Sequence, residues 1–409
     1  MIQTNFKSVL MALVLVLPSM ALTRVAKSIA LLSDAPKAVV DEAWQLVNRE
    51  YVDRSFNGHD WRAVRQDYLS RTYTSQGQAY QAVNEMVNLL EDEYTRFLPP
   101  QALNDLVNNV SGEFIGVGVT VSVNPQTREW MVVEPFRESP ADNAGIRPRD
   151  VIVSLNGTKT ADIDPRNAAP YLIGPVGSKL TMVVRRQDQQ ETYTLVREQI
   201  NLNPLTYQAR PTPKGKVGYI RLPVFTTKSP AAMKKAITDL EQQQVVGYIL
   251  DLRGNPGGVL ESGIAIAQQW IRQGRIMSLT TVRGGTEVYN GNQTALTQKP
   301  LQVLVDEESA SASEVLAGAL QDNQRAVLIG EKTFGKGVVQ SLEKLGDGAG
   351  MVITVAKYST PSGQDIHKKG IQPDEVIPTD DTALEHLETH RFDQDLAYQR
   401  AQANLLRSL

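Results

Sequence analysis

Serine and lysine residues between positions 305 and 340 are the side chains of this chain whose types and spacing could carry covalent chemistry. Ser309, Ser311 and Ser313 alternate with alanines after an apolar run, and Lys336 follows between two glycines. A serine hydroxyl becomes a strong nucleophile when a base removes its proton, and a neutral lysine amine is such a base. The lysine pKa of about 10.4 must then fall toward ~7–8, which burial can achieve. The spacing does not choose among the three serines.

Other catalytic chemistries have less support in the sequence. Cysteine is absent, which excludes disulfides, thiolate catalysis and thiolate metal sites. Of the four histidines, only His367 falls where strands alternate with helices. No G-x-x-x-x-G-K-[ST] motif is present, so a phosphate-binding loop is not indicated.

Each of these residues also has an ordinary structural interpretation. Ser311 and Glu314 match the S-x-x-E capping box that begins a helix, and Lys336 could be a solvated turn residue. A second turn, "LRGNPGG" at 252–258, likewise ends an apolar strand just before a helix. Ligands in α/β layers gather at the carboxyl ends of strands, where helix N-termini offer N–H groups that suit an oxyanion.

The elements that must position these residues fall into four stretches. Apolar residues at helical spacing predict an N-terminal helical region over 35–110. Alternating β-branched residues predict a compact β-rich module over 112–200. From 201 to 380, strands alternate with helices, which predicts an α/β layer. Residues 381–409 form a polar tail with helical character. The predicted fold class is therefore α/β and multidomain.

The first residues predict export. Lys7 provides a short basic region, Val9–Leu17 is apolar, and Pro18 precedes small residues. This is typical of a signal peptide spanning residues 1–21, the alternative being an uncleaved anchor. No later segment is apolar enough to cross a membrane, so we expect no stable membrane span after signal removal. The net charge of -3 gives no reason to expect nucleic acid as a partner.

Several motifs together resemble the carboxyl-terminal processing proteases, or tail-specific proteases, which are serine endopeptidases with a Ser-Lys pair. The motifs occur in the family's order and are "LRGNPGG", "SASASE", "ALQDNQRAVLIGEKTFGKGVVQ" and "YSTPSGQDIHKKGIQPD". The N-terminal "NREYVD", "FNGHDW" and "EDEYTRFLPP" are similar to members from photosynthetic organisms. The resemblance implies a Clp protease/crotonase-like catalytic core at 201–380 with an inserted PDZ domain at 112–200.

The resemblance also implies roles for particular residues. By position in the motifs, Ser311 is the nucleophile, Lys336 the general base and Gln340 the residue that orients the lysine. The remaining matches are two oxyanion-hole donors, Gly257 and Ala312, and a supporting acidic residue, Asp322. On a straight strand Gln340 would lie ~13 Å from Lys336, so direct contact requires a bend.

The β-rich module carries the family's loop for a peptide carboxylate. Its residues are Gly116, Val117, Gly118 and Val119, and an extended peptide would add there as a strand. Relatives often have an arginine in "LIRGP" that is proposed to couple this module to catalysis. Here the stretch is "LIGPVG", and Arg166 lies upstream in a different context. Peptide binding is therefore expected, whereas the sequence leaves open whether the PDZ domain activates the protease or only tethers the substrate.

The resemblance implies an exported serine endopeptidase of the periplasm or thylakoid lumen. Its partners would be protein or peptide substrates with a free C-terminus, and neither a cofactor nor a metal is implied. One alternative is a PDZ scaffold with an inactive protease core, which a covalent serine-directed probe would distinguish. Another is a crotonase-type acyl-thioester enzyme, which the export signal and the PDZ-like insert disfavour.

Overall fold

The computed structural model forms two compact units, which are residues 1–106 with 204–409, and residues 107–203. It describes residues 14–16, 36–123, 127, 129–136, 138–163, 169–187, 189–201, 204–282, 284–378 and 392–409. Most of the predicted signal peptide, and Arg166, lie outside the described residues. The expected 112–200 module falls within the second unit, whereas the N-terminal helices and the α/β layer share the first.

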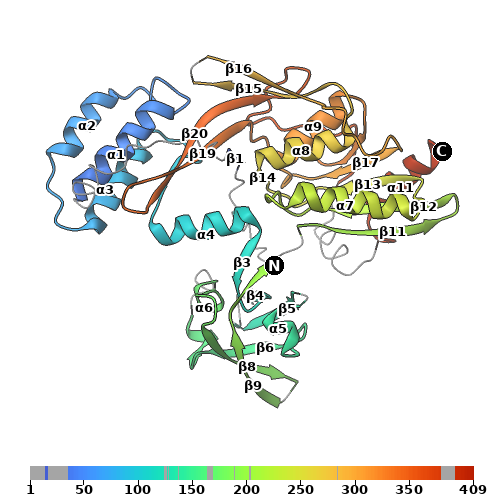
Figure 1. The fold of residues 1–409 in the computed structure, drawn as a ribbon, viewed down its shortest axis with the longest axis horizontal. Coiled ribbons are helices and arrows are strands. Elements are labelled where there is room, and N and C mark those ends of the chain that lie inside the picture. The colour runs from blue at the N-terminus through green and yellow to red at the C-terminus, as the bar shows by residue number, and fades with distance from the viewer. Residues whose placement is uncertain are drawn as a thin grey trace. The chain divides into compact units, whose positions relative to one another are not determined.

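After β1 (Val14–Val16), the first unit continues with three helices, labelled in Figure 1, and a short strand. They are α1 (Pro36–Glu50), α2 (Trp61–Ser70), α3 (Gln76–Asn88) and β2 (Arg96–Leu98), and α4 (Pro100–Ser111) follows. Asp60 and Ser75 cap α2 and α3 by accepting backbone N–H groups. The buried faces of α1 and α3 join one hydrophobic cluster with Phe97, Met351 and Ile353. The helical region is thereby packed onto a sheet of the α/β layer.

That sheet has the order β14-β1-β19-β20-β15-β16, with β2 also paired to β20. Its strands are β1 (Val14–Val16), β14 (Gly258–Val259), β15 (Arg275–Thr281), β16 (Thr286–Asn290), β19 (Val338–Lys344) and β20 (Gly350–Ser359). Strand β1 runs parallel to both of its neighbours, with Leu15 opposite Val259 on one side and Gln340 on the other. A segment of the predicted signal peptide thus fills the gap between β14 and β19.

The second sheet has the order β11-β12-β13-β17-β18-β21, and all of its neighbours except β11 and β12 are parallel. Its strands are β11 (Thr206–Thr212), β12 (Gly215–Arg221), β13 (Gly247–Asp251), β17 (Leu301–Val305), β18 (Val327–Gly330) and β21 (Glu375–Val376). Its helices are α7 (Ser229–Gln242), α8 (Leu260–Trp270), α9 (Ala312–Asp322) and α11 (Leu396–Arg407).

Alternation along β13 explains how helices cover both faces of this sheet. Tyr248 and Leu250 pack in the cluster that contains α7, α8 and α9, while Ile249 packs in the cluster with α11. Figure 1 shows α7, α8 and α9 grouped together. The expectation of a polar tail at 381–409 needs correction for its described part. The face of α11 that carries Tyr398, Ala401 and Leu405 is buried against the sheet.

The second unit is built on the antiparallel sheet β4-β5-β6-β8-β9, with a separate β3–β10 pair. Its elements are β3 (Glu113–Gly116), β4 (Val119–Val123), β5 (Trp130–Pro135), α5 (Pro140–Asn143), β6 (Val151–Leu155), β7 (Thr158–Lys159), η1 (Thr160–Asp162), α6 (Ala169–Leu172), β8 (Lys179–Arg186), β9 (Gln189–Val196) and β10 (Glu198–Asn201). Trp130, Ile152 and Leu180 are fully buried in its core.

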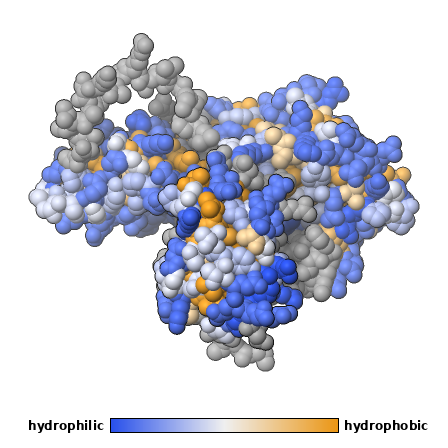
Figure 2. All heavy atoms as spheres, turned by 60° about the horizontal axis from the view of Figure 1, so that its bottom comes forward, coloured by the Kyte–Doolittle hydropathy of each residue, from blue (hydrophilic) through white to orange (hydrophobic). Residues whose placement is uncertain are grey.

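The molecular surface is mainly hydrophilic on the face drawn in Figure 2, with hydrophobic residues in small groups. Scattered apolar residues are normal on a protein surface. Within the described ranges, no helix is long and apolar enough to cross a membrane.

Candidate active site

Ser311 has a backbone conformation that serine rarely adopts. It precedes α9 with φ 64° and ψ -116°, and its side chain is fully buried. A non-glycine residue in such a region costs about 1–3 kcal/mol and is typical of functional sites. Among the described residues, its hydroxyl has no hydrogen-bond partner. A strained, buried and unengaged hydroxyl is chemically available.

The two neighbouring serines are engaged in structural hydrogen bonds. The Ser309 hydroxyl donates to the carbonyl of Leu252 at 2.9 Å. The Ser313 hydroxyl donates to the carbonyl of Asn255, also at 2.9 Å. Both serines therefore tie the serine segment to the glycine turn at 252–258, whereas the Ser311 hydroxyl has no partner in the described part of the chain.

Glu314 joins the serine segment to the lysine segment. Its Oε2 accepts the backbone N–H groups of Ser311 and Lys336, each at 2.8 Å. Its Oε1 accepts from the Gly335 N–H at 2.7 Å and the Thr333 hydroxyl at 2.6 Å. Burial raises the pKa of this carboxyl, although these hydrogen bonds oppose the rise. The sequence had indicated Glu314 only as part of a capping box. The Glu314 carboxylate accepts the Ser311 N–H as in that box, whereas the Ser311 hydroxyl makes no hydrogen bond to the described residues.

Lys336 is fully buried and is not a solvated turn residue. Burial lowers the pKa of its amine to about 7, and the Arg96 guanidinium acts in the same direction. The preceding Gly335 permits this placement, because a Cβ on it would lie 2.7 Å from the Gly370 nitrogen. Near neutral pH, a large share of the amine is therefore unprotonated and able to accept a proton.

Gln340 lies on β19 with its side chain fully buried. Its Nε2 donates to the Thr354 hydroxyl at 3.3 Å, and its Oε1 has no partner among the described residues. The pairing of β19 with β20 is irregular between Val339 and Gln340. The strand is therefore not straight at this point. A contact between Gln340 and Lys336 would require such a bend.

The two expected oxyanion donors are the N–H groups of Gly257 and Ala312, which lie beside Ser311. They differ in whether the N–H group already has a hydrogen-bond acceptor. A Cβ on Gly257 would lie 2.7 Å from the Ser311 Cβ and 2.9 Å from the Ala312 nitrogen, so only glycine allows this approach. The Gly257 N–H donates to the Asn255 Oδ1 at 2.8 Å. Ala312 is the first residue of α9, where helix geometry leaves the N–H without an intrahelical acceptor.

A buried ion-pair cluster holds the start of the glycine turn. The Arg253 guanidinium contacts Asp251 at 2.6 Å and Asp395 at 2.7 Å, and all three side chains are almost fully buried. The next residue, Gly254, donates its N–H to the Asp306 carboxylate. Because Asp395 caps α11, the C-terminal helix is anchored directly to the turn that carries Gly257.

Asp322 and His367, two further candidates from the sequence, lie at different distances from Ser311 and Lys336. Asp322 ends α9, about 16 Å along the helix from Ser311 at ~1.5 Å per residue. Its carboxylate accepts the Ser362 N–H at 2.8 Å, so it fixes a neighbouring loop. His367 is closer, because its ring lies 6.4 Å from that of Tyr94, which contacts Lys336. Burial lowers the pKa of His367.

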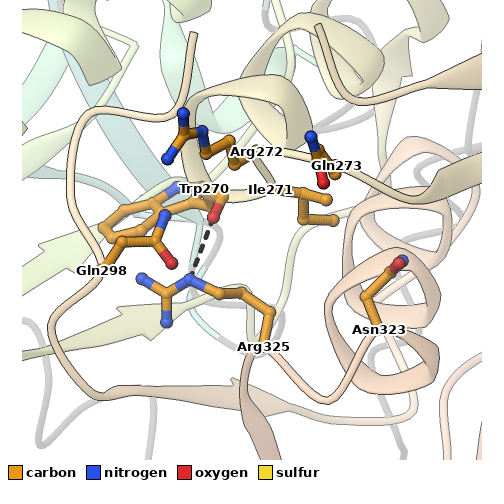
Figure 3. Close-up of a pocket in the computed structure, with 7 residues that line it drawn as sticks. All are labelled: Trp270, Ile271, Arg272, Gln273, Gln298, Asn323 and Arg325. Atoms are coloured by element: carbon orange, nitrogen blue, oxygen red, sulfur yellow. Dashed lines mark hydrogen bonds between the residues drawn. The ribbon is translucent and has the colours of Figure 1, made fainter. Parts of the chain in front are cut away.

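A pocket elsewhere on the first unit lacks comparable chemistry (Figure 3). It measures about 250 Å³ and is lined by Trp270, Ile271, Arg272, Gln273, Gln298, Asn323 and Arg325. The Arg325 Nε donates to the Trp270 carbonyl at 2.9 Å, so the guanidinium caps the end of α8. The pocket lies at the far end of α9 from Ser311.

Among the described residues, no group of three or more acidic or histidine side chains could hold a metal ion.

The PDZ-like unit holds the loop at 116–119 through its carbonyl groups. The Val117 carbonyl accepts from the Ala141 N–H at 2.9 Å, and the Gly118 carbonyl accepts from the Phe136 N–H at 2.9 Å. Since C=O and N–H point oppositely across a trans peptide, the N–H groups of Gly118 and Val119 point away from this contact.

In the same unit, Arg197 lies beside "LIGPVG", the stretch at 172–177 in which the expected arginine is missing. Its guanidinium donates to the carbonyls of Tyr171 at 2.8 Å and Leu172 at 3.2 Å. This arginine lies between β9 and β10, and no sequence motif indicated it.

Comparison with known proteins gives the class. Residues 216–377 match Peptidase family S41, and residues 132–186 match the PDZ domain. The chain is 42% identical over 339 residues to the carboxyl-terminal-processing protease of Synechocystis sp., covering 82% of this chain and 79% of that protein. It is 43% identical over 362 residues to that of Picosynechococcus sp., covering 88% and 87%.

A solved structure supports the same class. The photosystem II D1 C-terminal processing protease is 34% identical with a TM-score of 0.58, and the match covers 84% of this chain and 93% of that one. The chain therefore belongs to the carboxyl-terminal-processing proteases, which are serine-type peptidases of family S41. This membership confirms the resemblance seen in the sequence.

Proposed function

We propose that this protein is an exported endopeptidase that binds the free C-terminus of a protein substrate through its PDZ unit and cleaves nearby with Ser311 and Lys336. The observation that carries the proposal is the shared carboxylate of Glu314, one oxygen of which accepts the backbone N–H groups of a strained serine and of a buried lysine whose pKa is lowered. Neither a serine that only caps a helix nor a solvated lysine would need this arrangement.

The chemistry begins with neutral Lys336, which accepts the hydroxyl proton of Ser311. The oxygen attacks the peptide carbonyl carbon, and the carbonyl oxygen becomes an oxyanion. Protonated Lys336 then gives its proton to the departing amine, which leaves an acyl-enzyme. Water, deprotonated by the same lysine, releases the acid product and regenerates the serine. Gln340, whose buried Oε1 has no hydrogen-bond partner among the described residues, orients the lysine amine.

The oxyanion is stabilised by two backbone donors. The Ala312 N–H adds the partial positive charge of a helix N-terminus. The Gly257 N–H must exchange its bond to Asn255 for one to the oxyanion. Binding of the substrate carbonyl between Gly257 and Ser311 supplies the competing acceptor.

The substrate passes the site as an extended strand. Support comes from β1, which lies parallel between Gly258–Val259 and Gln340–Ser341 and pairs with both. Removal of the predicted signal peptide after Ala21 would empty this gap for a substrate segment. The parallel strands and covering helices further favour a Clp/crotonase-like core. The cyanobacterial and chloroplastic relatives support an exported or lumenal location.

A cleavage assay with mass spectrometry tests the proposal. Purified mature chain is incubated with unfolded proteins that have free C-termini, and new termini are identified. We expect cleavage near the C-terminus by the wild type and less than 1% of it by Ser311→Ala. Ser313→Ala is the matched control and should retain cleavage. Equal cleavage by Ser311→Ala and wild type would disprove the assignment of Ser311 as the nucleophile. If a serine-directed probe labelled neither the wild type nor Ser311→Ala, a PDZ scaffold would be favoured.

A further inference from the structure

The turn before β2 belongs by sequence to the N-terminal helical region, yet it lies against Lys336. The Lys336 Nζ sits over the Tyr94 ring, 4.4 Å from its centroid. This is well within the range of about 6 Å at which a ring face attracts an ammonium group. Only 7% of Tyr94 is exposed, so the ring also keeps water from the amine.

The same turn reaches Gln340 through two threonines. The Thr95 hydroxyl donates to the Asp92 carboxylate at 2.6 Å and accepts the Thr354 N–H at 3.0 Å. The Thr354 hydroxyl in turn accepts from the Gln340 Nε2 at 3.3 Å. Thr95, Thr354 and Gln340 are all at most 5% exposed. The orientation of the Gln340 amide is therefore set from the N-terminal region.

Charged groups surround the lysine from several segments. Asp92 and Glu93 come from the turn, Arg96 is the first residue of β2, and Glu314 comes from α9. His367 comes from the opposite loop, with its ring near Tyr94. Next to burial, Arg96 does most to lower the pKa of Lys336, whereas the three carboxylates raise it.

We propose that residues 92–96 form a wall of the catalytic pocket, in which Tyr94 and Thr95 are positioning residues for Lys336 and Gln340. The inference rests on the proposed function. Tyr94 holds the amine against a ring face that favours its protonated form. Thr95, acting through Thr354, holds the amide that orients the amine. The N-terminal helical region is then part of the catalytic machinery as well as a packing partner of β20.

Opposite shifts in the pH dependence of cleavage separate this role from a merely structural one. Tyr94→Leu keeps an apolar wall but removes the ring face, so the midpoint of the activity rise should move down by about half a pH unit. Arg96→Gln removes a positive charge that disfavours the ammonium form, so the midpoint should move up by about half a pH unit. Tyr94→Phe keeps the ring and should restore the wild-type midpoint.

Thr95 is tested through the rate. Thr95→Val removes the hydroxyl that links Asp92 to Thr354, and we expect kcat to fall by about tenfold with little change in KM. Thr95→Ser keeps the hydroxyl and should recover most of the rate. Recovery by serine would show that the hydrogen bond, and not the bulk of the side chain, is what matters.

A control variant perturbs the same region away from the lysine. The Tyr80 ring packs on Phe97 at 4.7 Å, and its hydroxyl donates to Asp347 at 2.8 Å. Tyr80→Leu should lower the melting temperature and leave the pH midpoint unchanged. A similar shift in Tyr80→Leu and Tyr94→Leu would mean that general loosening causes the effect, and would overturn the inference.

The experiment measures kcat/KM from pH 5.5 to 10 with one peptide substrate for the full mature chain. Should Tyr94→Leu not fold, Arg96→Gln and the Thr95 pair decide the outcome. Wild-type cleavage by Lys336→Ala would overturn the proposed function itself. If Lys336→Ala abolishes cleavage while the turn variants keep the wild-type midpoint and rate within twofold, the turn has no positioning role and the proposed function stands.

Discussion

The backbone N–H groups of Ser311 and Lys336 donate to the same oxygen of Glu314, each at 2.8 Å. A buried carboxylate that accepts four hydrogen bonds gives each segment little freedom to move without the other. One side chain thus ties the backbone of Ser311 to that of Lys336, although the two residues come from different elements.

Replacing Glu314 with glutamine should therefore affect both catalysis and stability. The new NH2 group would face N–H donors in place of an acceptor, and buried unsatisfied donors cost about 1–3 kcal/mol each. We expect cleavage to fall by more than a hundredfold and the free energy of unfolding to fall by roughly 2–4 kcal/mol. Urea denaturation and a peptide assay measure the two effects. Glu308→Gln, an exposed neighbour, should change neither, and wild-type activity in Glu314→Gln would refute the coupling.

The strained conformation of Ser311 predicts an unusual order of stability. At most positions alanine is favoured over glycine by about 1 kcal/mol, because glycine loses more chain entropy. At Ser311 the positive φ reverses this, so Ser311→Gly should be more stable than Ser311→Ala by about 1 kcal/mol. Thermal unfolding of both inactive variants tests the order. The matched pair Ser313→Ala and Ser313→Gly, inside α9, should show the ordinary preference for alanine.

The depressed pKa of Lys336 predicts how stability depends on pH. Between about pH 7 and the unfolded value of 10.5, the folded chain binds fewer protons at this site than the unfolded chain does. Wild-type stability should therefore gain up to about 1.4 kcal/mol per pH unit from this group as pH rises through that window. Below about pH 7, the full cost of burying the charge remains. Lys336→Met lacks the contribution, so its stability advantage over wild type should shrink from pH 7 to pH 10. A constant difference would show that the amine is not desolvated.

The rate of cleavage should rise with pH through about 7, because the base is the neutral form of Lys336. His367 is the histidine that the structure brings near the site, with its ring 6.4 Å from that of Tyr94. His367→Ala should keep the rise in a plot of kcat/KM against pH. Its disappearance in that variant would identify the histidine as the base and remove Lys336 from that role.

Recognition of the substrate's end can be measured without cleavage. Full-length Ser311→Ala is titrated with a peptide bearing a free carboxylate and with its C-terminal amide. The loop at 116–119 should favour the free acid by roughly 1.5–3 kcal/mol, the range for a hydrogen bond to a charged group. Because the expected arginine is absent, turnover of the two peptides by the wild type should differ less than their affinities. Equal affinity in calorimetry would mean that the loop does not read carboxylates.

The sequence predicted the α/β alternation because buried strands such as β13 and β17 read as apolar runs between turn residues. It could not choose Ser311 without the family resemblance, because the difference among the serines lies in partners from the 252–258 turn. Glu314 matched a familiar helix cap, and that local interpretation hid its contacts with residues 333–336. Asp92 and Tyr94 lie in the motif "EDEYTRFLPP", but no local pattern relates them to a lysine so distant in the chain. Polar residues interrupt the apolar face of α11, so the sequence pattern predicts a polar tail there.

The place of β1 has a consequence for which proteins can be processed. Strands β14 and β19 both pair with β1, so they lie two strand spacings apart, about 9.5 Å. That width admits one extended chain but not a helix of about 10–12 Å diameter. Under the proposed function, in which a substrate segment takes the place of β1, the gap would accept only locally unfolded chain, whatever its side chains. A folded domain would be excluded, and the length of unstructured tail beyond that domain would set how far the cut can lie from it.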